Sequence, residues 1–393
     1  MTDLLIVGGG IMGLWAALMA HRAGIDTTLV ERQSIGAGAS GGILGALMPH
    51  VPDRWNEKKQ FQFDALVSLE AEIRRLEAET GLSAGYRRSG RIIPLAKPHL
   101  RTIALRHEQE ALENWETANR TFSWHVRDAS DTPGWPDSAA AECGMVFDTL
   151  AARVAPRALI DMLSAVLRGS RHVHMKEGTD VAGLDPIAGK AELRGGETIA
   201  FGNCILAAGV QSFPMIDALH PGALAASGMA VKGQAALLKT DIDPSWPVIY
   251  SDGLYLVPHE DGRVAVGSTS ENSFGDPFAC DRQLDDLLER AYSVVPMLRE
   301  AEVLQRWAGL RPKAIGREPM VGRHPDFPRL FTLTGGFKVS FGLAHELAAS
   351  VIGDITGQPG SDLPQSFRCQ EHIALLRTGD VRNRKTPLRD SGV

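Results

Sequence analysis

The N-terminal segment alternates between short apolar runs and a longer helical pattern. Leu4 to Val7 is a continuous apolar run of the kind found in buried parallel strands. Ile11 to Ala23 is rich in Ala, Leu and Met, which favour helix, and Gly24 follows as a stop signal. Thr27 to Val30 is a second short run. The pattern predicts a strand, a helix and a second strand in succession.

The turn between the first strand and the helix carries Gly8, Gly10 and Gly13 at G-x-G-x-x-G spacing. These glycines allow a tight turn, close approach of the backbone to a pyrophosphate, and close packing of helix on strand. The second strand ends at Glu31, where a carboxylate accepts hydrogen bonds from a ribose 2′-OH and repels a 2′-phosphate. The unit therefore predicts binding of FAD or NAD rather than NADP. The alternative is a strand–helix–strand unit without a ligand.

A glycine-rich segment, GAGASGGILGALMP, follows from Gly36. It either lies against a flat group that the backbone approaches closely, such as a flavin ring, or is an ordinary surface loop. The dinucleotide motif that precedes it favours contact with a flavin ring.

Helical and strand patterns alternate along the next part of the chain, and strand patterns dominate from Val231. A strand, a glycine turn and a helix then recur near the end. A strand also accounts for His172 to His174 better than a metal site does. We expect helices over residues 58–80, 97–119, 155–167 and 282–294, and strands over residues 86–95, 181–184, 203–209, 231–240, 248–258 and 263–270.

This order predicts an α/β protein (α+β overall), with a Rossmann-type nucleotide-binding domain and an inserted antiparallel-sheet substrate domain. Ligands usually lie in the crevice between domains arranged in this way. We assign residues 1–85, 147–228 and 305–370 to the first domain, 86–146 and 229–304 to the second, and 371–393 to a loosely held C-terminal tail.

Composition narrows the class of protein. Apolar residues make up 44% and charged residues 22% of the chain, and the net charge is −6, which argues against nucleic acid as a partner. No apolar run approaches the ~20 residues that span a bilayer, and the N-terminus lacks the basic region of a signal peptide. The four cysteines are scattered and indicate neither a disulfide framework nor a metal site. We expect a cytoplasmic protein.

The chain resembles the family of FAD-dependent amine oxidoreductases that contains D-amino-acid oxidase, glycine oxidase and sarcosine oxidase. The resemblance covers about residues 3–357. Four blocks carry it in order: LLIVGGGIMG with Glu31, GASGGILGALMP, YLVPHEDGRVAVGST, and WAGLRP followed by TGGFKVSFGLA. The resemblance implies a Rossmann FAD-binding domain with a substrate domain on an antiparallel sheet.

The resemblance also implies the residues that contact FAD. Sarcosine oxidases attach flavin through a cysteine shortly after the GLRP block, and this chain has none there, so noncovalent FAD is expected. The implied FAD contacts are Gly8, Gly10, Ile11, Met12, Gly13, Glu31, Arg32, Ala39, Ser40, Gly42, Ile43, Val181, Ala208, Gly209, Gly335, Gly336, Phe337, Lys338, Val339 and Ser340.

Three residues match the family's substrate contacts. Arg311 in GLRP matches the arginine that binds the substrate carboxylate in glycine and D-amino-acid oxidases, and Tyr255 matches their hairpin tyrosine. Lys338 follows the sarcosine oxidase pattern, whereas glycine oxidases place an arginine there. Structural roles remain the alternatives: a salt-bridged interior arginine, a core tyrosine and a solvated loop lysine.

The resemblance implies oxidation of a small amino acid or N-substituted glycine to an imino acid, with dioxygen, a quinone or a protein as electron acceptor. One alternative is an FAD-dependent dehydrogenase of a 2-hydroxy acid, which needs a base such as His50 near the ring. Others are the flavin subunit of a larger complex, as in opine oxidases, and a tRNA-modifying flavoprotein. The sequence leaves open the substrate and whether the chain forms homo-oligomers or needs a heteromeric partner.

Overall fold

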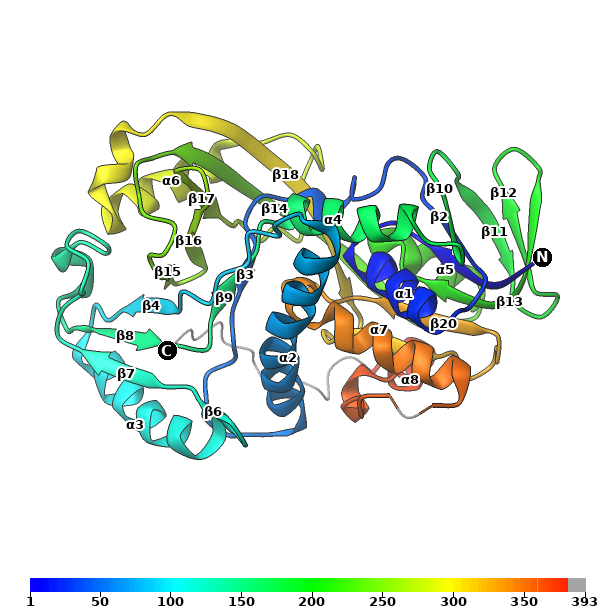
Figure 1. Ribbon diagram of the computed structural model, residues 1–393, viewed down its shortest axis with the longest axis horizontal. Coiled ribbons are helices and arrows are strands. Elements are labelled where there is room, and N and C mark those ends of the chain that lie inside the picture. The colour runs from blue at the N-terminus through cyan, green and yellow to red at the C-terminus, as the bar shows by residue number, and fades with distance from the viewer. Residues whose placement is uncertain (359, 381–393) are drawn as a thin grey trace.

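Two β-sheets, one in each half of the molecule, organise the fold (Figure 1). The computed structural model describes residues 1–358 and 360–380. Within that range, no helix has the length and apolar character needed to cross a bilayer. A cytoplasmic location stays a prediction.

The first sheet has a parallel core in the order β10, β2, β1, β13 and β20. Hairpin β11–β12 extends it antiparallel from β13, and β19 pairs antiparallel with β20. Its strands are β1 (Thr2–Val7), β2 (Thr27–Val30), β10 (Val173–Lys176), β11 (Val181–Asp185), β12 (Lys190–Leu193), β13 (Thr198–Leu206), β19 (Met320–Arg323) and β20 (Leu330–Thr334).

Helices cover both faces of this sheet. Leu4, Ile6 and Leu29 point into a core shared with α1, α2, α4 and α7, whereas Leu5 and Val7 point into a core shared with α5 and α8. This alternation is the period of a strand that is buried on both faces. The helices are α1 (Ile11–Arg22), α2 (Glu57–Thr80), α4 (Pro156–Arg168), α5 (Ser212–Ala218), α7 (Ser340–Thr356) and α8 (Cys369–Thr378).

The second sheet runs in the order β18, β14, β17, β16, β15, β4, β8 and β7 and is mainly antiparallel. One face packs against α6 (Arg282–Val294), and α3 (Pro98–Asn114) lies beside β7. Its strands are β4 (Arg91–Pro94), β7 (Trp124–Arg127), β8 (Met145–Asp148), β14 (Gly228–Lys239), β15 (Val248–Ser251), β16 (Leu254–His259), β17 (Arg263–Gly267) and β18 (Val303–Ala314).

Short elements complete the chain. Two small ribbons and five short 3₁₀ helices lie in the described residues. They are β3 (Ala46–Leu47) with β9 (Ala152–Arg153), β5 (Glu116–Thr117) with β6 (Arg120–Thr121), and Ala39–Gly41, Ser138–Ala141, Gly209–Gln211, Pro296–Glu300 and Gln365–Phe367.

The structure confirms the predicted α/β class (α+β overall) and the opening strand–helix–strand unit. The strand expected over 248–258 forms two paired strands, β15 and β16, and the strand expected over 263–270 ends at Gly267. Other elements are shorter than expected. The strand expected over 86–95 is limited to β4, because Gly85 and Gly90 adopt positive φ values of 60° and 78° and interrupt it. The helix expected over 97–119 ends at Asn114, where the chain turns into the β5–β6 hairpin.

Two segments differ from their expected placement. Residues 305–314 were assigned to the nucleotide-binding domain, but β18 pairs with β14 along its length in the second sheet. Residues 371–378 were assigned to the tail, but they belong to α8, which buries Ile373 and Leu376 against the first sheet. Residues 381–393 of the predicted tail lie outside the described residues. The domain division itself stays a prediction.

Helix α8 packs against the first sheet, and this contact predicts an effect on stability. Ile373 is fully buried, so Ile373→Ala should lower the free energy of unfolding by about 2–5 kcal/mol. The exposed neighbour Gln370 supplies the control, and Gln370→Ala should leave stability unchanged. Urea denaturation of both variants measures the difference. Equal midpoints for the two variants would contradict the placement of α8.

Candidate active site

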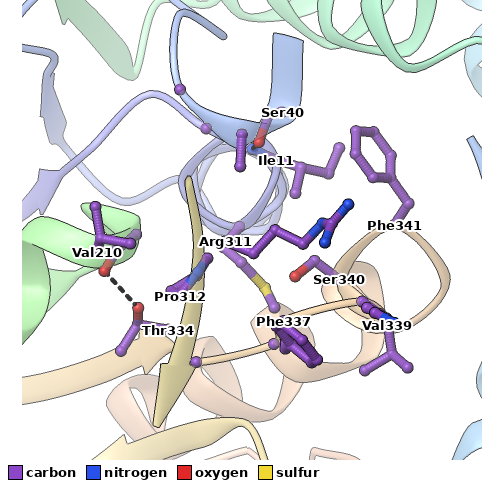
Figure 2. Close-up of a pocket in the computed structure, with 18 of the residues that line it drawn as sticks. Ile11, Ser40, Val210, Arg311, Pro312, Thr334, Phe337, Val339, Ser340 and Phe341 are labelled. Carbon is purple, nitrogen blue, oxygen red and sulfur yellow. Dashed lines mark hydrogen bonds between the residues drawn. The ribbon is translucent and has the colours of Figure 1, made fainter. Parts of the chain in front are cut away.

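A large cavity lies between the two sheets. Its volume is about 1460 Å³, and both sheets and the glycine-rich segment contribute to its wall. Figure 2 shows part of it, with Arg311 pointing between Ile11 and Phe341. The predicted site residues that line it are Gly8, Gly10, Ile11, Met12, Glu31, Arg32, Ala39, Ser40, Gly42, Ile43, Val181, Ala208, Gly209, Tyr255, Arg311, Gly335, Gly336, Phe337, Lys338, Val339 and Ser340.

The first glycine turn at this cavity requires glycine for steric reasons. Gly8 has φ +112°, and a Cβ there would lie 2.5 Å from the carbonyl oxygen of Ala207. A Cβ on Gly13 would lie 1.9 Å from the carbonyl oxygen of Gly8. Gly13 does not line the cavity, so it acts by letting α1 pack closely on the turn rather than by touching a ligand.

The start of α1 presents backbone donors to the cavity. Gly10 is the N-cap and, being glycine, makes no side-chain capping bond of its own. The N–H of Ile11 donates to Ser40 Oγ at 2.9 Å, which fixes the glycine-rich segment against the helix start. The remaining N–H groups of the first turn and the helix dipole suit a phosphate.

Glu31 holds the glycine turn in addition to facing the cavity. Its Oε2 accepts from the N–H of Gly9 at 2.8 Å, and its Oε1 accepts from the N–H of Gln33 at 2.9 Å. An ionised carboxylate has about four acceptor sites, so both oxygens keep capacity for a ribose hydroxyl.

Arg311 lies on β18 and crosses the neighbouring strand. A Cβ on Gly233 of β14 would lie 2.1 Å from Arg311 Nη2, so the guanidinium occupies the space that any other residue at 233 would fill. Arg311 Nη1 donates to the carbonyl oxygen of Thr269 at 3.0 Å. Burial lowers the pKa of Arg311 to about 10, while nearby Tyr255 and Glu271 act in the opposite direction. The side chain therefore remains a cation at neutral pH.

A buried polar network supports the carbonyl that holds Arg311. Thr269 Oγ1 donates to Glu271 Oε1, and Gln234 Nε2 donates to the same oxygen at 2.9 Å. Lys232 is 2% exposed, and its Nζ lies 3.7 Å from Glu271 Oε2 and 3.1 Å from Asp281 Oδ2. The network fixes the segment after β17 and supplies a counter-charge behind Arg311.

The second glycine turn, between β20 and α7, closes the cavity from the nucleotide-binding side. The N–H of Phe337 donates to the carbonyl oxygen of Pro312 at 3.0 Å, which ties this turn to β18 directly after Arg311. Thr334 Oγ1 donates to the carbonyl oxygen of Gly209 at 3.0 Å (Figure 2). The ammonium group of Lys338 lies 5.6 Å from the centre of the Phe337 ring and lines the same cavity as Arg311.

His259 positions the glycine-rich segment, a role the sequence did not reveal. It is buried on β16, and its Nε2 donates to the carbonyl oxygen of Leu44 at 3.0 Å. The residues that follow it, Glu260, Asp261 and Gly262, are typical of a surface turn. Burial lowers the pKa of His259 to about 4, so its ring is neutral at pH 7.

One group of side chains in the described residues has the composition of a metal site, although the sequence indicated none. His220 Nε2 and His324 Nε2 lie 3.0 Å apart, with Asp326 beside them. His324 Nδ1 accepts from the N–H of Asp326 at 3.2 Å, and the Asp326 carboxylate pairs with Arg377. The Nε2–H of His324 therefore donates to Nε2 of His220, and each of these two atoms has a hydrogen-bond partner.

These features fit FAD. The glycines of the first turn leave open the space that side chains would fill. The start of α1 offers N–H groups for a pyrophosphate, and Glu31 faces the same cavity. None of the four cysteines, all of which are free, lines the cavity. Noncovalent binding of FAD by these residues stays a prediction.

The chain belongs to the family of FAD-dependent oxidoreductases that includes D-amino-acid oxidase, because the family model matches residues 3–350. Its cofactor is FAD. Glycine oxidase from Pseudomonas aeruginosa is 29% identical over 356 residues, which cover 87% of this chain and 91% of that protein. Glycine oxidase from Bacillus licheniformis is 25% identical over 95% of this chain and 99% of its own length.

Solved structures share the fold. Glycine oxidase from Geobacillus kaustophilus superposes with a TM-score of 0.82 over 94% of this chain and 98% of that chain, at 21% identity. Iminodiacetate oxidase from Chelativorans superposes with a TM-score of 0.80 over 93% of this chain and 98% of that chain, at 20% identity.

Several residues at the cavity were missed by sequence reasoning because their roles depend on register. Gly233 makes room for Arg311, and Thr269 holds it through a backbone carbonyl. Trp307 packs 3.3 Å from where a Gly42 Cβ would lie. The pairing of β14 with β18 places Gly233 beside Arg311.

The position of Glu31 predicts its effect on the cofactor. Glu31→Ala should weaken FAD binding by about 1–3 kcal/mol, because hydrogen bonds to a charged group are lost both in the turn and toward the ribose. Equilibrium dialysis against FAD measures this, with Glu192→Ala, on β12 and outside the cavity lining, as the control. Unchanged affinity in Glu31→Ala would remove this residue from the site.

Proposed function

We propose that the protein oxidises a small amino acid or an N-substituted glycine to an imino acid. The observation that carries this proposal is a half-buried, cationic Arg311 that lines the cavity. The similarity to glycine oxidases over most of the chain supports it.

The side chains of this site orient a substrate rather than exchange protons with it. Bound FAD supplies the acceptor for the hydride that leaves the substrate α-carbon. A planar guanidinium binds a carboxylate through two parallel hydrogen bonds and so fixes its rotation as well as its position. Arg311 would hold the carboxylate, and the Tyr255 hydroxyl would donate to it. Lys338 would add positive charge from the second glycine turn.

The alternatives predict other features of the site. A 2-hydroxy acid dehydrogenase needs a base for the hydroxyl proton, and His50 lines the cavity. Burial, followed by Lys59, Lys58 and Arg91, lowers the pKa of His50 to about 4, which makes it a weak base. Oxidation of an amine is therefore the better supported reaction.

The flavin spectrum provides the first test. The purified holoenzyme should be yellow and should release FAD on acid denaturation. Under anaerobic conditions, glycine, sarcosine or a small D-amino acid should bleach the flavin band. Bleaching by 2-hydroxy acids and not by any of these amines would favour the alternative.

Arg311→Lys separates geometry from charge. Lysine keeps the cation but loses the planar pair of donors, so kcat/KM should fall by an amount equivalent to about 2–4 kcal/mol. FAD affinity should stay the same. A variant with native kcat/KM would show that Arg311 does not orient the substrate.

Gly233→Ala tests the path that the guanidinium takes. The added methyl would lie 2.1–2.5 Å from guanidinium atoms of Arg311, so the side chain must move. We expect KM to rise at least tenfold with little change in FAD binding. Gly275→Ala is the matched control, because an added Cβ there meets nothing within 4 Å. Equal KM values in the two variants would contradict the crossing of Arg311 over β14.

A further inference from the structure

One row of paired residues crosses the second sheet on the cavity side. Trp307 on β18 pairs with Ala235 on β14, Ala235 pairs with Gly267 on β17, and Gly267 pairs with Tyr255 on β16. Trp307, Ala235 and Tyr255 line the cavity. Residues that pair across neighbouring strands share a face. The row therefore has an aromatic side chain at each end and two small residues between them.

The side chain of Leu44 fills the space above Gly267. A Cβ on Gly267 would lie 2.9 Å from Leu44 Cδ1 and 3.2 Å from Leu44 Cδ2, so the glycine leaves room for this side chain. Leu44 belongs to the glycine-rich segment and lines the cavity. A residue of that segment thus reaches onto the sheet that carries Arg311 and Tyr255.

Leu44 lies diagonally opposite Arg311 on this face. Positions 233 and 267 are diagonal neighbours, because Ala235 pairs with Gly267 and Gly233 lies two residues earlier on β14. The Cβ positions of such neighbours are about 7–8 Å apart. The Arg311 guanidinium lies 2.1–2.5 Å from the first Cβ position, and the Leu44 methyl groups lie 2.9–3.2 Å from the second. A carboxylate bound to Arg311 would therefore have its attached carbon next to Leu44.

His259 fixes the backbone of Leu44. It is buried on β16, four residues after Tyr255 and therefore on the same face. Its Nε2 donates to the carbonyl oxygen of Leu44 at 3.0 Å. Its Nδ1 is buried without a hydrogen-bond partner among the described residues. A ring held by a strand of the sheet thus sets how far Leu44 reaches over Gly267.

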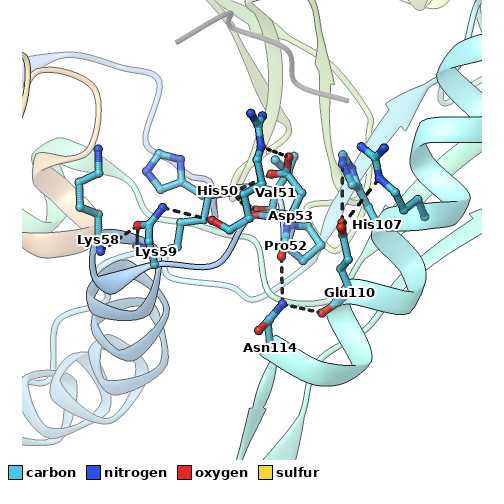
Figure 3. Close-up of polar contacts among 12 residues, drawn as sticks. His50, Val51, Pro52, Asp53, Lys58, Lys59, His107, Glu110 and Asn114 are labelled. Atoms are coloured by element: carbon cyan, nitrogen blue, oxygen red, sulfur yellow. Dashed lines mark hydrogen bonds and ion pairs between the residues drawn. The ribbon is translucent and has the colours of Figure 1, made fainter. Parts of the chain in front are cut away.

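The chain beyond Leu44 is held in the same way. Gln62 on α2 donates through Nε2 to the carbonyl oxygen of Met48 at 3.2 Å and accepts from the N–H of His50 at 2.6 Å. Asn114 Nδ2, at the end of α3, donates to the carbonyl oxygen of Pro52 at 3.1 Å (Figure 3). Side chains from three separate elements therefore bind this backbone, and Leu44 cannot withdraw from the cavity without breaking their hydrogen bonds.

We propose that Leu44 determines which substrates fit, by closing the space next to the carbon that carries the carboxylate. A hydrogen atom or a methyl group on that carbon fits beside Leu44, whereas a branched side chain does not. His259 is the positioning residue that holds Leu44 in place. This inference rests on the proposed function, because it requires the substrate carboxylate to bind Arg311.

Carboxylic acids that differ only in chain size test the inference without turnover. Acetate and 3-methylbutanoate are titrated into the FAD-loaded protein, and the change in flavin absorbance gives their dissociation constants. The native protein should prefer acetate. Leu44→Ala should bind 3-methylbutanoate about 10- to 100-fold more tightly relative to acetate, because the opened space buries the added methyl groups.

Two further variants calibrate the effect of Leu44→Ala. Leu44→Val removes less of the side chain and should give a smaller shift in the same direction. Leu237→Ala is the matched control, because Leu237 packs against the same small apolar cluster as Leu44 but does not line the cavity. This control should keep the native ratio of the two dissociation constants. The affinity for FAD should be the same in all three variants.

The positioning role of His259 has its own test. His259→Leu loses the N–H donor and should shift the ratio of the two acids in the direction of Leu44→Ala. His259→Gln keeps an N–H donor and should restore the native ratio. An altered ratio in His259→Gln equal to that in His259→Leu would show that this hydrogen bond does not position Leu44.

The outcomes separate this inference from the proposed function. An unchanged ratio in Leu44→Ala would overturn the inference and leave the Arg311 proposal standing. Loss of FAD affinity in this variant would show that Leu44 serves the cofactor instead. If neither acid perturbs the flavin of the native protein, both the Arg311 site and this inference are wrong. Failure of every amine to bleach the flavin would count against the proposed function, whatever the titrations give.

Discussion

The pairing of β18 with β14 is the constraint on which the site depends. These two long strands carry Arg311 and Gly233, and their register places the arginine across the glycine. The end of β18 then contacts the second glycine turn, through the Phe337 N–H to Pro312 and the bridge between Lys313 and Gly336. One ladder thus connects the substrate-facing sheet with the turn that borders the flavin end. A shift along it would move Arg311 away from the cavity.

The sequence predicted the parts of the site that are local in the chain. Gly8, Gly10, Gly13 and Glu31 follow from a motif whose spacing has a steric explanation, and the structure shows the close contacts that the spacing requires. The strand, glycine turn and helix around Lys338 were also predicted from their local sequence pattern. The other parts of the site depend on which strands pair in the folded protein. Residues 305–314, which we assigned to the nucleotide-binding domain, pair with β14 in the second sheet, because a strand's partner is not encoded in its own pattern.

Burial explains the other differences. His259 lies in a turn-like sequence, yet its ring is buried and bonded to the glycine-rich segment. The segment after residue 370 is polar in composition, yet Ile373 and Leu376 recur at helical spacing and pack against the first sheet. Nothing in the sequence distinguished Arg91 from the other residues of its strand. Its buried, partly unsatisfied guanidinium became apparent only when β4 was placed beside β15 and β8.

The central claim is that the half-buried Arg311 guanidinium directs the reaction of FAD toward amines that carry a carboxylate. It is tested most directly by comparing the native enzyme's kcat/KM for an amino acid that bleaches the flavin with that for the same amine without its carboxylate. The account predicts at least a 30-fold preference for the amino acid, about 2 kcal/mol. Equal values for the two compounds would contradict it.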